Sequence, residues 1–152
     1  MIDLLIRVVI DTNVWISAFI NPWGAPAQLI DRARQGEFAL VMSDYLIDEI
    51  SEVCRRERVR RRLRIDVREI DVLLERFRVE SIDVTLTGMI HLCRDPDDDA
   101  ILETAIKGDA HFLVSRDDDL KRDLELIDHL ASHGVGVISV AQLLEMLNAR
   151  TA

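Results

Sequence analysis

Short apolar runs that end in acidic residues constrain the fold of this chain more than any other feature. The first run spans residues 4–10, is interrupted only by Arg7, and stops at Asp11. A strand that is apolar on both faces is covered on both faces, as in a parallel sheet flanked by helices. In open α/β sheets the ligand site lies just beyond the carboxyl ends of the strands, where Asp11 is expected.

Further apolar runs alternate with amphipathic segments along the chain. Strands are predicted for residues 38–42, 79–84, 112–115 and 135–140, and helices for residues 25–36, 44–56, 67–77, 100–106 and 141–147. This alternation predicts an α/β fold with a parallel sheet. The 152 residues, 49% of them hydrophobic, fit one domain spanning 1–152.

Four acidic positions belong to separate segments that a parallel sheet brings to one edge: Asp11, Glu49, Asp99 and Asp117. Each has a simpler interpretation, as a helix N-cap or a solvated charge. Carboxylates held close together raise one another's pKa unless a cation neutralises them. A set of carboxylate oxygens favours Mg²⁺ or Mn²⁺, and these four residues are the predicted metal ligands and catalytic acids.

Other metal sites do not fit the sequence. The histidines at 91, 111, 129 and 133 show no zinc-site pattern. The aspartate tract 95–99 is not an EF-hand loop, because Ala100 and Ile106 stand where the turn glycine and the bidentate glutamate belong. Cys54 and Cys93 are too few and too far apart for a disulfide framework.

Several acids near the predicted site have more than one interpretation. Glu103 lies one helical turn after Asp99 and could support the ion through its water shell. Asp97, Asp98 and Asp119 are interpreted as caps or solvated charges, although Asp97 or Asp119 could replace a named ligand.

Four segments, taken in order, resemble the PIN-domain ribonucleases, and among them the branch related to VapC toxins. The matching segments are 8–14 (VVIDTNV), 43–50 (SDYLIDEI), 95–105 (DPDDDAILETA) and 113–120 (LVSRDDDL). The resemblance implies a three-layer α/β/α sandwich with a mainly parallel sheet of about five strands. It also implies that Asn13 orients Asp11 and that Ser115 braces the site around Asp117. Ser115 departs from the more common threonine but keeps the hydroxyl.

The charge is unevenly spread along a chain of net charge -9. Residues 55–64 hold seven arginines and one glutamate, so this tract carries +6 and the remainder -15. Such a tract can contact phosphates and steer a polyanion towards an acidic centre. Arg58, Arg60, Arg61 and Arg62 are therefore candidates for binding RNA, the alternatives being a solvated connection or a surface for an acidic partner.

The expected function is hydrolysis of single-stranded RNA, in which the metal activates a water molecule and no protein nucleophile is required. By resemblance the protein is the toxin of a toxin-antitoxin pair, a homodimer silenced by a small antitoxin. The alternatives are a housekeeping RNA-processing nuclease and a catalytically silent RNA-binding module. A phosphotransfer receiver domain fits less well, since Asp11 has no acidic neighbour and no lysine follows a late strand. No apolar stretch reaches the roughly 18 residues of a membrane helix, and no signal-peptide pattern precedes the first strand, so a cytoplasmic location is expected.

Overall fold

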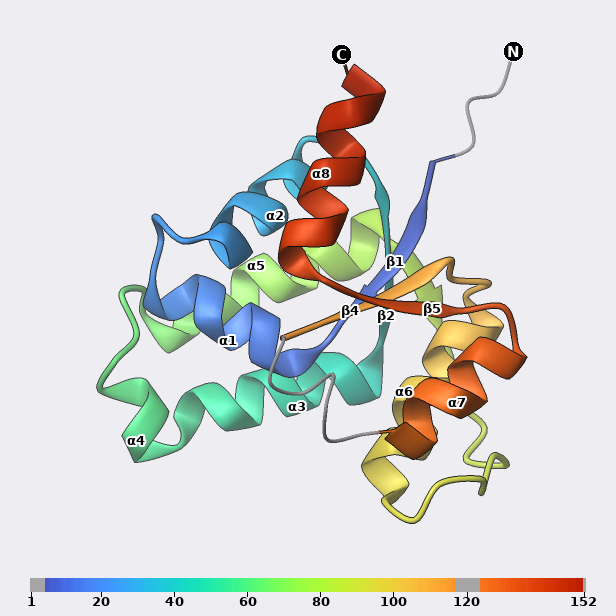
Figure 1. Ribbon diagram of the computed structural model, residues 1–152. Coiled ribbons are helices and arrows are strands. Elements are labelled where there is room, and N and C mark those ends of the chain that lie inside the picture. Colours follow the sequence, from blue (N-terminus) through green and yellow to red (C-terminus); the bar gives the residue numbers. More distant parts are fainter. Residues whose placement is uncertain (1–4, 117–123, 152) are drawn as a thin grey trace.

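The computed structural model describes residues 5–116 and 124–151, and in them a sheet of five parallel strands is covered by helices on both faces (Figure 1). The strands are β1 (Arg7–Ile10), β2 (Ala39–Ser43), β3 (Ile82–Val84), β4 (Phe112–Ser115) and β5 (Gly136–Ser139). Their order across the sheet is β3-β2-β1-β4-β5, and every neighbouring pair is parallel. The predicted α/β/α architecture is confirmed.

The helices form the two outer layers. They are α1 (Thr12–Ile20), α2 (Ala25–Arg34), α3 (Asp44–Arg55), α4 (Glu57–Arg60), α5 (Val67–Glu80), α6 (Pro96–Lys107), α7 (Leu124–Ser132) and α8 (Val140–Thr151). Helix α6 packs on β1 and β2 and against α7. Helices α1, α2, α5 and α8 lie across the sheet from this pair, and α3 packs against α1 and α5 (Figure 1).

The boundary between the third predicted strand and the helix before it differs from the structure, and three helices, α1, α4 and α7, were not predicted. The strand expected over residues 79–84 is only Ile82–Val84, because α5 continues to Glu80 with its apolar stripe facing the sheet. Helix α1 gives a weak amphipathic pattern since it is buried on nearly all sides. Helix α7 is short and was also missed.

Helix α1 is anchored by Trp15, which is fully buried. Its indole Nε1 donates to the carbonyl oxygen of Ile10 at 3.1 Å, and its ring meets Phe77 of α5 edge-on at a centroid distance of 5.3 Å. Edge-to-face ring pairs of this kind contribute about 0.5–1.5 kcal/mol beyond the apolar area that they bury. The end of β1 and the start of α1 are thus fixed relative to α5.

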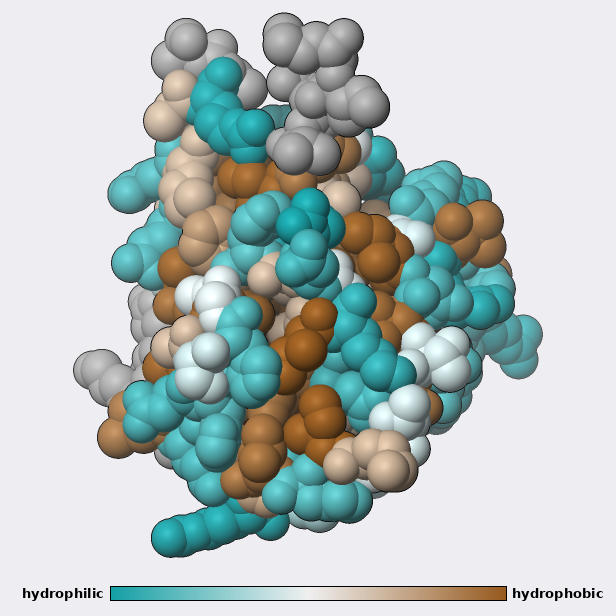
Figure 2. Space-filling view, turned by 90° about the vertical axis from the view of Figure 1, so that its right-hand side faces the viewer, coloured by the Kyte–Doolittle hydropathy of each residue, from teal (hydrophilic) through white to brown (hydrophobic). Residues whose placement is uncertain are grey.

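The surface combines hydrophilic and hydrophobic residues. In Figure 2 the hydrophobic residues form patches that are separated by hydrophilic ones. Across the described part of the chain, no helix has the length and apolar character needed to cross a membrane. Cys54 and Cys93 are both free thiols, as the sequence predicted.

Candidate functional site

The strand order reverses direction between β1 and β4. Strands β2 and β3 lie on one side of β1, whereas β4 and β5 lie on the other. The carboxyl ends of two strands at such a switch point border a crevice, because their connections leave towards opposite sides of the sheet. Residues that directly follow β1 and β4 are therefore the first to consider.

Asp11 directly follows β1 at this point. Its backbone N–H donates to Val114 O at 2.9 Å, which extends the pairing of β1 with β4. Its Oδ1 accepts a hydrogen bond from Thr12 N at 2.8 Å, as an N-cap does, and Ser115 Oγ donates to its Oδ2 at 3.4 Å. The carboxylate is held between the first turn of α1 and the last residue of β4.

Glu49 extends towards the same region from the middle of α3. Burial raises the pKa of this half-buried carboxyl, and the negative charges of Asp97 and Asp11 raise it further. Like charges have this effect only when they lie close by. The charges of Asp11, at the end of β1, and of Asp97, at the N-terminus of α6, therefore both act on Glu49 of α3.

Tyr45 joins two of these elements. It lies in the first turn of α3, and its hydroxyl donates a hydrogen bond to Asp97 Oδ1. The hydroxyl also lies close enough to Glu49 to lower the pKa of that carboxyl. Positions four residues apart on a helix share a face, which explains how Tyr45 and Glu49 reach the same cluster.

The hydroxyl of Thr12 is a buried polar group without a hydrogen-bond partner among the described residues. It lies beside Glu49 and lowers the pKa of that carboxyl, although no hydrogen bond of ordinary length joins the two side chains. Buried hydroxyl groups are nearly always paired with protein or ordered water. An unpaired one next to acids fits a place that holds water or a hydrated ion.

Asp99 faces a different segment. Its Oδ1 accepts hydrogen bonds from Cys93 N at 2.8 Å and from Leu92 N at 2.9 Å, and the bond from Cys93 contributes most to lowering the pKa of this carboxyl. The side chain is buried. Asp11 and Asp97 thus lie near enough to Glu49 for their charges to raise its pKa, whereas Asp99 binds the backbone at residues 92–93.

Glu103, one turn further along α6, holds the same segment at a second point. Its carboxylate accepts hydrogen bonds from Thr87 N at 2.6 Å, Thr87 Oγ1 at 2.8 Å and Gly88 N at 3.0 Å. Gly88 has a φ of 71°, a backbone conformation that favours glycine. Lys107 Nζ lies 3.2 Å from Glu103 Oε2. Glu103 and Asp99 together fix the segment 85–94 against α6.

The remaining predicted residues contribute less to this geometry. Asp117, like Asp119, lies outside the described residues, and so does the predicted brace of Ser115 around it. Asn13 is exposed in the first turn of α1, and its orienting effect on Asp11 stays a prediction.

Within 5–116 and 124–151, no three His, Cys, Asp or Glu side chains are grouped closely enough to hold an ion directly. Such spacing suits Mg²⁺, which keeps several water ligands and binds through one or two carboxylates.

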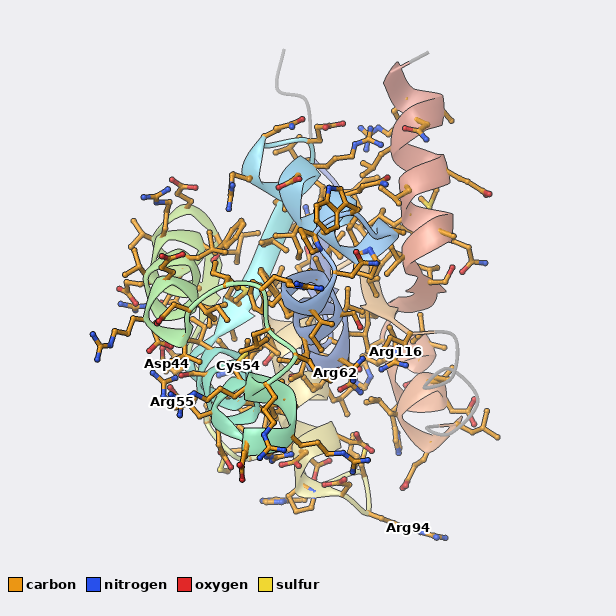
Figure 3. All side chains as sticks on the ribbon, turned by 90° about the vertical axis from the view of Figure 1, so that its left-hand side faces the viewer. Asp44, Cys54, Arg55, Arg62, Arg94 and Arg116 are labelled. Carbon is orange, nitrogen blue, oxygen red and sulfur yellow. The ribbon has the colours of Figure 1, made fainter. Side chains whose placement is uncertain are left out.

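The arginine tract begins where α3 ends. Its backbone is fixed at the far side by the bond from Arg64 N to Phe19 O, 3.0 Å, at the end of α1. Arg61 pairs with Glu57 at 2.6 Å, whereas no ion pair with a described residue engages Arg58, Arg60 or Arg62. Figure 3 looks onto the left-hand side of Figure 1, with Arg62 beside α4 and Arg116 at the end of β4.

Comparison with known proteins agrees with this fold. A model of the PIN domain family matches residues 7–119. The chain is also 32% identical over 120 residues to the uncharacterized protein MJ1680 of Methanocaldococcus jannaschii, a match that covers 79% of this chain and 76% of that protein. The chain belongs to the PIN domain family, whose members are generally nucleases that use divalent metal ions. The VapC-like subtype is a finer assignment, which the relative's name does not address.

Sequence reasoning did not identify Tyr45 and Thr12, and it placed Asp97 among the caps. The signal for Tyr45 was its spacing of four residues from Glu49 on a predicted helix. Thr12 had no signal, because its significance lies in a missing hydrogen-bond partner. Only the orientation of α6 about its axis, which the structure gives, distinguishes the exposed Asp97 from the buried Asp99.

We predict that Glu103→Gln destabilises the protein by roughly 1–3 kcal/mol at neutral pH, since a carboxylate that accepts several hydrogen bonds is lost. Burial alone raises the pKa of Glu103, but the bonds from Thr87, Lys107 and Gly88 outweigh it and lower the pKa from 4.5 to about 2. The stabilisation is complete above the unfolded pKa and disappears as the pH falls towards about 2. Urea unfolding across this range should show the difference from wild type shrinking below pH 4.5.

The exposed Glu145 of α8 provides the control, since Glu145→Gln should leave the unfolding free energy unchanged at every pH. A difference between wild type and Glu103→Gln that stays constant with pH would contradict the role of the charged carboxylate.

Proposed function

We propose that this protein is a metal-dependent endoribonuclease that hydrolyses phosphodiester bonds in single-stranded RNA. One observation carries the proposal: Asp11 ends β1 at the switch point of a PIN fold, where Ser115 of β4 donates to its carboxylate, and its charge and that of Asp97 act on Glu49 of α3. Such an arrangement is unfavourable unless a cation offsets the repulsion. Carboxylate oxygens favour Mg²⁺ or Mn²⁺.

The residues have distinct roles in this proposal. Asp11, Glu49 and Asp97, with Asp117 from the sequence, hold the ion directly or through water. When bound, the ion polarises the phosphate and lowers the pKa of a water molecule. Glu49 and the Thr12 hydroxyl orient the attacking water from the side of α3 and α1. Ser115 fixes the rotation of the Asp11 carboxylate through its bond to Oδ2.

We assign the acid of α6 to Asp97 rather than Asp99. The Asp97 carboxylate is exposed and acts on Glu49, while the hydrogen bonds that Asp99 accepts from Leu92 N and Cys93 N secure the backbone at residues 92–93. Glu103 has the same structural role as Asp99.

We expect Asp11→Asn and Asp97→Asn each to reduce RNA cleavage by at least about 100-fold with little loss of stability. Removing a direct ligand of the metal should lower activity more than removing a residue that only hydrogen-bonds to a ligand. Asp99→Asn should instead lower the melting temperature while the folded fraction keeps its activity. The measurement compares cleavage of single-stranded RNA and DNA in Mg²⁺, Mn²⁺ or EDTA with thermal unfolding of each variant.

Asp48→Asn is the matched control, since Asp48 is exposed on α3 next to Glu49 and should leave both readouts unchanged. Cleavage that persists in EDTA would contradict metal dependence. A wild-type protein that binds RNA without cutting it would support the silent RNA-binding module instead. Loss of cleavage in Asp99→Asn at full stability would restore Asp99 to the centre.

The arginine tract is the proposed path of the RNA away from the centre. Helix α3 carries Glu49 near its middle and ends at Arg55, so a rise of about 1.5 Å per residue separates them by only about 9 Å. A strand whose phosphate lies at the acids therefore reaches the tract within a few nucleotides. Arg58, Arg60 and Arg62 are the strongest candidates, because no ion pair with a described residue competes for them.

Replacing Arg58, Arg60 and Arg62 together by glutamine should weaken RNA binding on the order of tenfold and reduce the salt slope of log K by up to about 2. Fluorescence anisotropy with a labelled single-stranded RNA in EDTA measures the affinity and its salt dependence without cleavage. The control replaces Arg68, Arg76 and Arg150, which are equally exposed and change the net charge by the same amount. Equal losses in the two triple variants would show that only net charge matters.

The toxin role is the finer part of the proposal, and the resemblance of the motif segments to VapC-like proteins supports it. In this role a small antitoxin covers the acidic centre, and two copies of a single domain spanning residues 1–152 form a homodimer. Housekeeping RNA processing is the alternative, since it needs the same site but no inhibitor.

Expression of the wild-type chain alone should slow cell growth if it is a toxin, whereas Asp97→Asn at equal abundance should not. The measurement is growth rate after induction, with the mass of the purified protein determined by light scattering. Normal growth with an active purified nuclease would favour the housekeeping role. Equal slowing by both variants would show that growth depends on something other than cleavage.

A further inference from the structure

A hydroxyl group reaches each of the two acids that flank Glu49, and the two hydroxyls come from different elements. Ser115 at the end of β4 donates to Asp11 Oδ2. Tyr45 in the first turn of α3 donates to Asp97 Oδ1. Carboxylates at metal sites are commonly oriented by such hydrogen bonds, which leave the other oxygen for the ion.

We propose that Tyr45 is a positioning residue of the acidic centre, whose hydroxyl sets the orientation of the Asp97 carboxylate towards the ion. The inference rests on the proposed function, because it concerns the same site. The phenol is protonated at neutral pH and the carboxylate can only accept, so the direction of the bond is fixed.

Both ends of this contact are anchored by backbone capping. Ser43 Oγ accepts from Leu46 N at 3.3 Å and fixes the first turn of α3, which carries Tyr45. Asp95 Oδ1 accepts from Asp97 N at 2.9 Å and fixes the first turn of α6. A rigidly mounted donor restricts the carboxylate to a narrow range of orientations before an ion arrives.

A second tie keeps the two helices at a constant separation. Thr104 Oγ1 lies 3.0 Å from Ser43 Oγ, and both hydroxyls are buried between β2 and α6. The relative position of α3 and α6 therefore does not depend on the exposed bond from Tyr45 to Asp97. Removing the phenol hydroxyl should change the orientation of one carboxylate and leave the fold intact.

The alternative is that Tyr45 only helps to hold α3 against α6. An exposed hydrogen bond of this kind adds only modestly to stability, because water competes for both groups. A purely structural role would thus appear in the melting temperature and not in the affinity for an ion. Measuring both the melting temperature and the affinity for an ion therefore distinguishes the positioning role from the structural one.

The test measures Mn²⁺ binding by isothermal titration calorimetry, without RNA, for wild type and Tyr45→Phe. We expect the dissociation constant for Mn²⁺ to rise about 10–100-fold in Tyr45→Phe while the melting temperature changes little. Ser51→Ala is the matched control, because Ser51 also lies on α3 and donates to a carboxylate, Asp71, at 2.9 Å. It should leave Mn²⁺ binding unchanged.

A double-mutant cycle with Asp97→Asn tests whether Tyr45 acts on the ion through Asp97. Tyr45→Phe should have little further effect on Mn²⁺ affinity in the Asp97→Asn background, whereas fully additive losses of affinity would show that Tyr45 does not act through Asp97. Unchanged affinity in Tyr45→Phe, with wild type binding Mn²⁺, would overturn this inference alone and leave the proposed nuclease standing. A wild-type protein that binds no Mn²⁺ would overturn both.

Discussion

The pairing of β1 with strands on both sides is the constraint on which the rest of the structure depends. Val8 pairs with Leu40 of β2 on one side and with Phe112 of β4 on the other, and β1 is buried from Val8 to Ile10. A shift of register by one residue would turn the side chains to the opposite faces and move Asp11 away from Ser115. Because the Asp11 N–H continues the pairing to Val114, the sheet itself sets the position of the first acid.

Helix α6 is the second element that the site requires, and its acids divide into two groups. Asp99 and Glu103 are buried, and buried carboxylates are tolerated only where hydrogen bonds replace the water that they lose. Here the replacement comes from backbone N–H groups of residues 87, 88, 92 and 93. Each buried acid therefore orders a part of the segment 85–94, and Asp97 lies exposed at the outer surface, where its charge acts on Glu49.

The sequence predicted the parallel sheet because its strands are apolar on both faces, and it predicted Asp11 because that residue ends the first strand. The sequence did not establish which of Asp97 and Asp99 belongs to the acidic site. The two residues are separated by about 200° around a helix of 3.6 residues per turn. One signal was present: Asp99 lies three residues before Leu102, on the face that Ile101, Leu102 and Ala105 bury. The roles of Thr12 and Tyr45 depend on contacts between separate elements, and the spacing of Tyr45 from Glu49 did not show its contact with Asp97.

The charge distribution has a physical logic for a nuclease with an acidic centre. Acids that hold an ion repel the phosphates of the substrate until the ion neutralises them, so binding energy has to come from elsewhere on the protein. In this chain the cationic tract stands at the end of α3, the same helix that carries Tyr45 and Glu49. One rigid helix thus fixes the separation between the groups proposed to hold the RNA backbone and those proposed to cut it. In this proposal the length of α3 sets the distance between the bound phosphates and the cut.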